Sequence, residues 1–200
     1  MIIVGLTGSI GMGKSTTANM FRKFGIAVHD SDAAVHEIYR GSGASKIESL
    51  FPGIVIAGKV DRGLLAKQVF ENAHALHQLE ELVHPLVAQD RDRFVSRSRA
   101  RGDRIVVLDI PLLFEVSATG MVDVTVVVSA SEAVQRARVL ARPGMTVERF
   151  RAILRKQTPD SVKRQWAHFI VDTGLGIDAA ERQVNSVLKA LSSTAMILRV

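Results

Sequence analysis

The residues from Gly8 to Ser15 have the types and the spacing of a loop that binds phosphate. They read Gly-Ser-Ile-Gly-Met-Gly-Lys-Ser and match the pattern G-x-x-x-x-G-K-[ST]. Glycines let the backbone curl so that successive N–H groups point at phosphate oxygens, and the helix that follows adds partial positive charge. The pattern predicts that Lys14 bridges the β- and γ-phosphates of a nucleotide, that the Ser15 hydroxyl binds Mg²⁺ and that Thr16 donates to the α-phosphate. The nucleotide-binding residues predicted in this loop are Gly11, Met12, Gly13, Lys14, Ser15 and Thr16.

The same glycines could form only a turn before a helix that carries an exposed lysine. The surroundings favour the phosphate loop, because the apolar β-branched run Ile2–Thr7 precedes it and apolar residues at helical spacing follow it. Such a loop identifies the phosphate donor but not the acceptor. No Asn is followed by Lys in this chain, which argues against the base-reading motif of GTPases, and motors and helicases are usually larger. A small-molecule kinase is therefore the leading hypothesis.

Candidates for the acceptor side follow the second apolar run, Ile26–His29, as Asp30-Ser-Asp32. Because ligands of α/β proteins bind at the carboxyl ends of parallel strands, we expect these carboxylates to lie beside the phosphate loop. One could accept the proton of an acceptor hydroxyl while the other supports Mg²⁺ or water. The structural alternative is a helix cap, since Asp and Ser are both good N-cap residues. Asp109 ends another apolar run and is a second candidate for orienting the metal, although an Asp can also simply end a strand.

Positive charge is concentrated in one segment of the chain. The 200 residues carry 26 Lys and Arg against 20 Asp and Glu, a net charge of +6, while residues 135–164 hold nine basic and two acidic residues. This cluster predicts a polyanionic partner, either a phosphate-rich small molecule or nucleic acid. Arg138 and Arg142 share a helix face at i, i+4, which favours a common anion such as the transferred phosphoryl group. The single Tyr and single Trp argue weakly against single-stranded nucleic acid, and residues from about 142 to 165 are expected to form a lid.

The pattern of apolar runs predicts the fold class. Short runs that are apolar on both faces suit strands buried between helix layers. We therefore predict a three-layer, doubly wound α/β fold with a five-stranded parallel sheet and helices on both faces. The predicted strands are Ile2–Thr7, Ile26–His29, Arg104–Ile110, Val124–Ser129 and Phe169–Asp172.

Helix signals fill most of the remaining chain. The first helix follows Gly13 and ends before Gly25, and capping-box spacing from Ser129 to Glu132 opens a segment that runs to about Arg142. Further helices are predicted over about 146–156 and 178–191. Residues from 61 to about 101 have no strand pattern and predict two or three helices, one of which Pro85 starts or kinks. The prediction is a single domain over 1–200 with a helical insertion at about 61–101, between the second and third strands of the sheet.

Composition excludes several other classes of protein. No stretch approaches the roughly 18 consecutive apolar residues of a membrane span, and the apolar N-terminus lacks the basic region of a signal peptide. The chain has no Cys, which excludes a disulfide scaffold and fits a reducing compartment. We expect a soluble, cytoplasmic protein with no membrane partner.

An ordered set of motifs over nearly the whole chain resembles the dephospho-CoA kinase family. The most specific elements are the Asp-x-Asp at 30–32, His84-Pro85 and the Pro-Leu-Leu-x-Glu at 111–115, because a phosphate loop alone is generic. The resemblance also covers Gly5–Thr16, Gly58–Arg62, Leu64–Ala66, Val69-Phe70, Leu79-Glu80, Asp123, Gln135-Arg136, Arg138, Arg142, Arg155 and Gln157.

The resemblance implies transfer of the γ-phosphate of MgATP to the ribose 3′-hydroxyl of dephospho-CoA, within a phosphate-loop kinase fold that has a helical CoA-substrate region and a lid. It implies that Asp32 is the general base, that Lys14 and Arg138 act on the transferring phosphoryl group, and that Arg142 joins the loop in binding ATP. The residues implied to bind substrate are Asp32, His84, Pro111, Leu112 and Arg138.

The chain departs from the family pattern at Ser31, which replaces the Ala between the two aspartates, and at two positions before the last helix. Where the family usually reads Ala-Asp-x-x-Ile-x-Asn before the last helix, this chain has His168 in place of the Asp and Thr173 in place of the Asn. Contacts to adenine or ribose at these positions are therefore open, as is the choice between Asp30 and Asp109 near the metal. The alternative functions are another small kinase, for a nucleoside, shikimate or gluconate, and a nucleic-acid-binding ATPase. The motifs leave the oligomeric state open.

Overall fold

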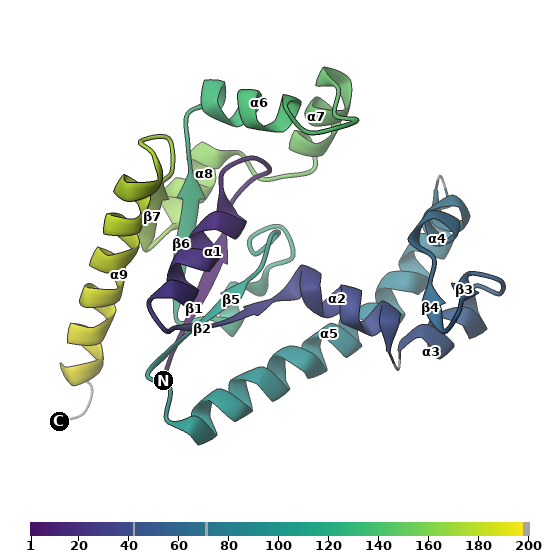
Figure 1. Cartoon of the computed structure of the whole chain (residues 1–200), viewed down its shortest axis with the longest axis horizontal. Helices are drawn as coiled ribbons and strands as arrows, with labels where there is room; N and C mark the ends of the chain where they lie inside the picture. Colours follow the sequence, from purple (N-terminus) through teal and green to yellow (C-terminus); the bar gives the residue numbers. More distant parts are fainter. Residues whose placement is uncertain (42, 71, 198–200) are drawn as a thin grey trace. The chain divides into compact units, whose positions relative to one another are not determined.

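The chain forms two compact units. The computed structural model describes residues 1–41, 43–70 and 72–197 (Figure 1). The first unit contains Met1–His29 and the chain from Ser98 onward, and the second contains Asp30–Arg97. The second unit is thus inserted between two strands of the sheet that forms the centre of the first, as the motif order suggests.

A five-stranded sheet forms the centre of the first unit, and its strand order is β2-β5-β1-β6-β7. The pairs β1–β5, β1–β6 and β6–β7 are all parallel. Each predicted strand is confirmed to within one residue at either end, because the buried β-branched runs coincide with the strands. The strands are β1 (Ile2–Thr7), β2 (Ala27–Asp30), β5 (Ile105–Asp109), β6 (Val124–Ser129) and β7 (Phe169–Asp172).

The order of the strands differs from the one we expected. We expected the end of β2 to lie beside the phosphate loop, but β5 lies between β2 and β1. The strands on either side of β1, whose carboxyl ends border the loop, are therefore β5, which ends at Asp109, and β6. Neighbourhood in a parallel sheet depends on the crossover connections, which place β5 next to β1 although the whole second unit separates them in sequence.

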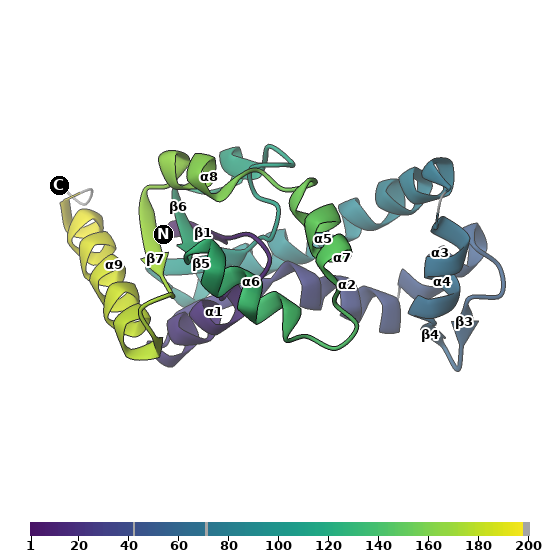
Figure 2. The same ribbon diagram turned by 90° about the horizontal axis from the view of Figure 1, so that it is seen from above.

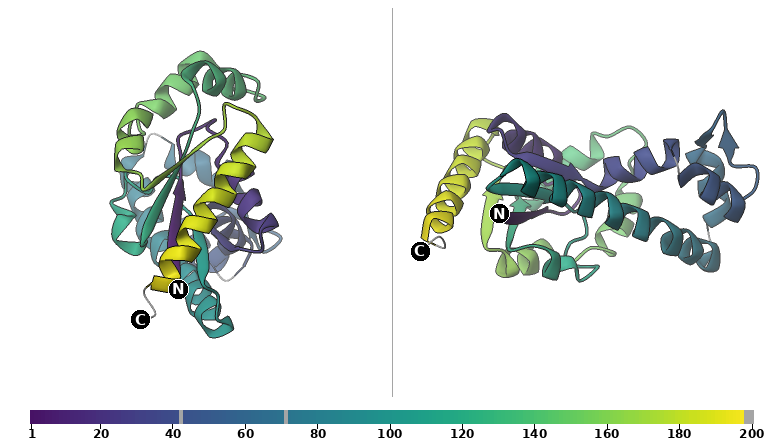
Figure 3. Two further views of the ribbon diagram at one scale, coloured as in Figure 1. Left: turned by 90° about the vertical axis from the view of Figure 1, so that its left-hand side faces the viewer. Right: turned by 90° about the horizontal axis from the view of Figure 1, so that it is seen from below.

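Helices cover both faces of this sheet, as predicted (Figures 2 and 3). Helices α1 and α9 pack on one face, where Val4, Phe21 and Val184 are fully buried in one core. Helix α8 and the segment 111–122 cover the other face, and a Cβ on Gly5 would lie 3.0 Å from Leu113. The helices of this unit are α1 (Lys14–Lys23), α6 (Glu132–Leu140), α7 (Val147–Leu154), α8 (Asp160–Trp166) and α9 (Ile177–Ile197), with a 3₁₀ turn, η1, at Ala118–Met121.

One predicted helix end is confirmed, and one predicted helix start is wrong. Gly25 follows α1 with φ +75°, so the predicted glycine stop is confirmed. The predicted cap of α6 is wrong, because Ser131 rather than Ser129 accepts the N–H of Val134. Ser129 is the last residue of β6, and its hydroxyl donates to Asp160 instead.

The second unit begins earlier than the predicted insertion, at Asp30 rather than at residue 61. It contains a hairpin that the sequence did not reveal, with Ala57 and Gly58 both at positive φ in the two-residue turn. No helix starts at Pro85, which lies inside α5. The elements of the second unit are α2 (Ser31–Arg40), α3 (Gly43–Leu50), β3 (Val55–Ile56), β4 (Lys59–Val60), α4 (Arg62–Val69) and α5 (Ala73–Arg101).

A core of its own holds the second unit together. Ile47 and Ile54 are fully buried in it, with Phe51 and Leu79 beside them. Within the described part of the chain, no helix combines the length and the apolar character that crossing a membrane requires.

Candidate functional site

The phosphate loop joins β1 to α1, and its glycines fit closely against neighbouring elements. Gly11 has φ +81°, and a Cβ there would lie 2.4 Å from a methyl group of Val139 on α6. Gly13, with φ +96°, is the N-cap of α1. A side chain at either position would disturb the curled backbone that the sequence pattern predicts.

Gly11→Ala is expected to impair both stability and nucleotide binding. Positive φ alone costs roughly 1 kcal/mol for a non-glycine residue, and the overlap with Val139 adds to this cost. Gly144 is a matched control, because its φ is +70° but a Cβ there would meet nothing within 4 Å. Thermal unfolding and ATP titration should therefore show a small loss of stability alone for Gly144→Ala and a larger loss with weaker ATP binding for Gly11→Ala. Equal effects of the two variants would show that the contact with α6 is unimportant.

Two glutamines hold the tip of the loop. The Ile10 N–H donates to the Gln157 side chain at 3.1 Å, and the Gln135 side chain donates to the Ile10 carbonyl at 2.7 Å. Gln135 is buried. Both glutamines belong to the motifs quoted above. Only the structure shows that these two residues, far apart in the chain, both bind Ile10 of the loop.

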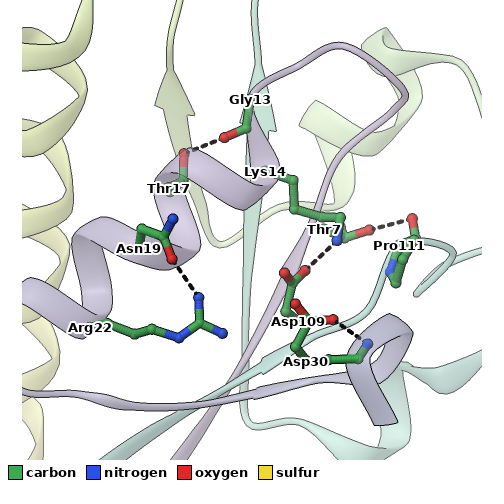
Figure 4. A network of polar contacts seen from close by, with 10 residues as sticks. Thr7, Gly13, Lys14, Thr17, Asn19, Arg22, Asp30, Asp109 and Pro111 are labelled. Carbon is green, nitrogen blue, oxygen red and sulfur yellow. Dashed lines mark hydrogen bonds and ion pairs between the residues drawn. The ribbon is translucent and has the colours of Figure 1, made fainter. Parts of the chain in front are cut away.

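Lys14 and Asp109 meet where β1 and β5 end (Figure 4). The Lys14 Nζ lies 2.5 Å from Asp109 Oδ1, and the Asp109 side chain is nearly fully buried. The Thr7 hydroxyl donates to the carbonyl of Pro111, which anchors the chain that leaves β5. The predicted position of Asp109 close to the loop is therefore found, and its partner here is the loop lysine.

A cavity of about 340 Å³ opens beside the loop. Arg138 of α6 and Arg142, just beyond its end, both line it, so these two predicted arginines lie at one site. Thr173 lines the same cavity from the end of β7. Its other lining residues are Gly11, Gly13, Thr16, Met20, Gly176, Ile177 and Ala180.

Arg138 is fixed by a single residue across this cavity. Its two terminal nitrogens donate to Thr173 Oγ1 at 2.8 Å and to the Thr173 carbonyl at 2.9 Å. The Thr173 hydroxyl in turn donates to the carbonyl of Met12 at 2.7 Å. The sequence showed Thr173 only as a departure from a pattern, and its contacts with Arg138 and the loop were not foreseen.

His168, the other departure, has a structural role. The Thr125 N–H donates to His168 Nδ1 at 3.1 Å, and the Thr125 hydroxyl lies 2.8 Å from the same nitrogen. The ring nitrogen therefore accepts a backbone hydrogen bond, as a carboxylate oxygen could. These contacts lie where β6 and β7 begin, at the opposite end of the strands from the phosphate loop.

The candidates for the acceptor side lie mostly in the second unit. Asp30 is the N-cap of α2 and accepts the N–H of Ala33 at 3.0 Å, as the structural alternative predicted. Asp32 lies exposed in the first turn of the same helix, and His84 lies exposed on α5. In the first unit, Pro111 and Leu112 follow β5, and the Leu112 side chain is 38% exposed.

The oxygen donors beside the loop fit a magnesium ion. The Ser15 side chain is exposed in the first turn of α1, and Asp109 supplies a carboxylate at the end of β5. Among the residues that the structure describes, no three His, Asp or Glu side chains gather into a metal-binding group. Mg²⁺ is usually bound by one or two protein oxygens together with substrate phosphates, and Ser15 and Asp109 supply two such oxygens.

Part of the basic cluster at residues 135–164 is buried, so not all of its positive charge faces an anionic partner, as the sequence had suggested. Lys163 is fully buried, and its Nζ lies 2.8 Å from Glu115 Oε1. The same carboxylate oxygen accepts the N–H of Thr158. Burial alone would raise the pKa of Glu115, but the hydrogen bonds from Lys163 and Thr158 hold it below the usual 4.5. Lys163 therefore neutralises a carboxylate of its own chain instead of facing an anionic ligand.

Glu115→Gln is expected to lower the free energy of unfolding at neutral pH by about 3 kcal/mol, because it leaves Lys163 buried without a counter-charge. A carboxyl whose pKa is lowered by folding stabilises the fold above its unfolded pKa. The difference from the native protein should therefore be complete above about pH 5 and shrink as the pH falls below 4.5.

The exposed pair between Lys23 and Glu181 provides the control, since Glu181→Gln should cost less than about 1 kcal/mol. Chemical denaturation at several pH values measures both variants. A pH-independent difference between Glu115→Gln and the native protein would contradict the assignment of this charge pair.

Comparisons with known proteins agree with this architecture. A family model described as dephospho-CoA kinase matches residues 2–178. A dephospho-CoA kinase of Mesorhizobium japonicum is 55% identical over 191 residues, which cover 96% of this chain and 97% of the relative. A crystal structure of a Thermus thermophilus protein superimposes with a TM-score of 0.82 at 35% identity, covering 94% of this chain and 96% of that one. A dephospho-CoA kinase structure from Campylobacter jejuni, at 21% identity and a TM-score of 0.69 with coverage of 94% and 96%, shares the fold.

Proposed function

The chain belongs to the dephospho-CoA kinase family, and we propose from this premise how its own residues transfer the γ-phosphate of ATP to the ribose 3′-hydroxyl of dephospho-CoA. The observation that carries the proposal is the phosphate loop between β1 and α1, with Lys14 at the start of α1 and two arginines that line one cavity beside the loop. These residues supply positive charge where a nucleotide triphosphate must lie.

ATP binds with its phosphates against the N–H groups of residues 11–16. Lys14 leaves Asp109 to contact the β- and γ-phosphates, since the same ammonium group serves either anion. The nucleoside part occupies the cavity of about 340 Å³, where Arg142 and Ile177 line the wall. Arg138 remains near the loop and stabilises charge on the transferring phosphoryl group.

The acceptor step requires a base for the ribose hydroxyl. Asp32 takes the proton as the hydroxyl oxygen bonds to the γ-phosphorus and the bond to the β–γ bridging oxygen breaks, so that the products are ADP and coenzyme A. Asp32 suits this task because Asp30, not Asp32, is engaged as the helix cap. His84, Pro111 and Leu112 are proposed to contact dephospho-CoA, within a substrate region that includes the second unit, Asp30–Arg97.

Ser15 would hold Mg²⁺, with Asp109 as the nearby carboxylate, and the ion would neutralise charge on the β- and γ-phosphates. We propose that the lid lies within residues from about 142 to 165, before α8, which packs against β6. Gln157, within this range, accepts the Ile10 N–H of the phosphate loop. We propose that the reaction takes place in the cytoplasm, where MgATP is abundant.

A panel of acceptors tests the proposal. Purified protein with MgATP should form ADP with dephospho-CoA and not with shikimate, gluconate, a nucleoside, or DNA and RNA oligonucleotides. The nucleic-acid alternative is weakened because Lys163 is buried in an internal ion pair, but it predicts nucleic-acid-stimulated ATP hydrolysis and binding that falls steeply with salt. Turnover with another acceptor, and none with dephospho-CoA, would refute the proposed function.

A further inference from the structure

Thr173 occupies a fixed position at the end of β7, beside the phosphate loop. Its N–H donates to the Ser129 carbonyl at 2.9 Å and continues the pairing of β6 with β7. The residue before it is also fixed, because the Asp172 N–H and carbonyl both bond to the Gln183 side chain. Thr173 is only 7% exposed. Its hydroxyl is therefore placed by the sheet and α9 rather than by a loose loop.

The hydroxyl of Thr173 connects two parts of the site. A hydroxyl has one proton and two acceptor positions. The proton goes to the Met12 carbonyl at 2.7 Å, since the Ser129 carbonyl is farther away at 3.4 Å. The oxygen is left to accept from Arg138 at 2.8 Å. A Cβ on Gly13 would lie only 3.1 Å from this oxygen, so the hydroxyl is in close contact with the loop.

This contact restricts a side chain that is otherwise free to move. Arg138 lies on an exposed position of α6, and an arginine there loses up to about 2 kcal/mol of conformational entropy when it is held in one rotamer. Two parallel hydrogen bonds to one residue, one to the hydroxyl and one to the carbonyl, fix both the place and the plane of the guanidinium group. The cost of ordering Arg138 is thus met before ATP binds.

We propose that Thr173 is a positioning residue for phosphoryl transfer, which holds the Arg138 guanidinium beside the phosphate loop through its hydroxyl. The inference rests on the proposed function of Arg138. At this departure from the family pattern, the threonine hydroxyl donates to the loop and accepts from the arginine at the same time.

The test compares Thr173→Val, which replaces the hydroxyl by a methyl group, with Thr173→Ser, which keeps it. With MgATP and dephospho-CoA, Thr173→Val should lower kcat by about 10-fold, the scale of one lost positioning hydrogen bond. Its KM for ATP should change less than about 2-fold, and Thr173→Ser should stay within about 2-fold of the native kcat. In an Arg138→Ala background, Thr173→Val should have almost no further effect on kcat, because the two residues act as one unit.

Thr125→Val is the control for loss of a buried threonine hydroxyl. Thr125 is 4% exposed and bonds to His168 far from the loop, so this variant should lower the melting temperature and leave kcat unchanged. An additive loss in the Arg138→Ala background, or a change confined to KM, would overturn the role of Thr173. An Arg138→Ala variant with native kcat would instead refute the role of Arg138 in the proposed function, and the role of Thr173 with it.

Discussion

Asp32→Asn is expected to lower kcat by about 10²-fold or more, with little effect on the affinity for ATP. The amide keeps the size of the side chain but cannot accept the proton of the 3′-hydroxyl, and a lost general base costs on the order of 10² to 10⁴ in rate. Steady-state kinetics with dephospho-CoA, together with ATP titration followed by calorimetry, separates the two effects.

Asp30→Asn is the matched control for this variant. Asp30 caps α2 through the N–H of Ala33, and asparagine is as good an N-cap residue as aspartate. This second variant should therefore keep the helix, and its kcat should remain within a few-fold of the native value. If both variants had native rates, the Asp-Ser-Asp sequence would serve the start of α2 and nothing else.

Lys14→Met is expected to lower kcat by about 10²- to 10³-fold and to weaken ATP binding. The change removes the positive charge nearest to the β- and γ-phosphates while it keeps a long unbranched side chain. Lys14→Arg should restore little, because a planar guanidinium group does not fit the place of a compact ammonium group. Rates should be measured well below the melting temperature, since the variant also removes the ion pair with the buried Asp109.

Lys23→Met provides the control on the same helix. Lys23 lies at the end of α1, is largely exposed and pairs with Glu181 on the surface. Its loss should change neither kcat nor the affinity for ATP. A Lys14→Met variant that melted at lower temperature but turned over at the native rate would assign Lys14 to the stability of β5 alone.

Most of the first unit was predictable because its signals are local. A buried strand needs a short run that is apolar on both faces, and all five such runs form the sheet. The glycine stop at Gly25 and the phosphate loop also depend on residues close together in the chain. The local structure of each of these segments could therefore be inferred without knowledge of the elements that pack against it.

The features that escaped prediction depend on residues far apart in the chain. Lys163 was counted in the basic cluster that predicted a polyanionic partner, and only the fold shows that Glu115 neutralises it. The place of β5 between β1 and β2 is set by a crossover that contains the whole second unit. Ser129 and Ser131 are equally good caps by type, and the choice between them depends on where β6 ends.

In the candidate site, too, the features set by local sequence were predictable, and the long-range contacts were not. The residues of the phosphate loop and the two arginines were predicted from their types, and the structure brings three of the loop residues, Gly11, Gly13 and Thr16, together with both arginines around one cavity. Thr173 was not predicted as a partner of Arg138, because no local pattern marks a threonine that receives a guanidinium group from another helix. A long-range hydrogen bond of this kind becomes visible only when β7 and α6 are placed.

The most direct test of the central claim is identification of the phosphorylated atom. The protein is incubated with MgATP and dephospho-CoA, and the products are analysed by mass spectrometry and ³¹P NMR, with 3′-deoxy-dephospho-CoA as the matched acceptor that lacks the reacting hydroxyl. The account predicts ADP and one new phosphomonoester on the ribose 3′-oxygen, and no product from the 3′-deoxy compound. A phosphate on another oxygen, or ADP formed without a phosphorylated acceptor, would contradict it.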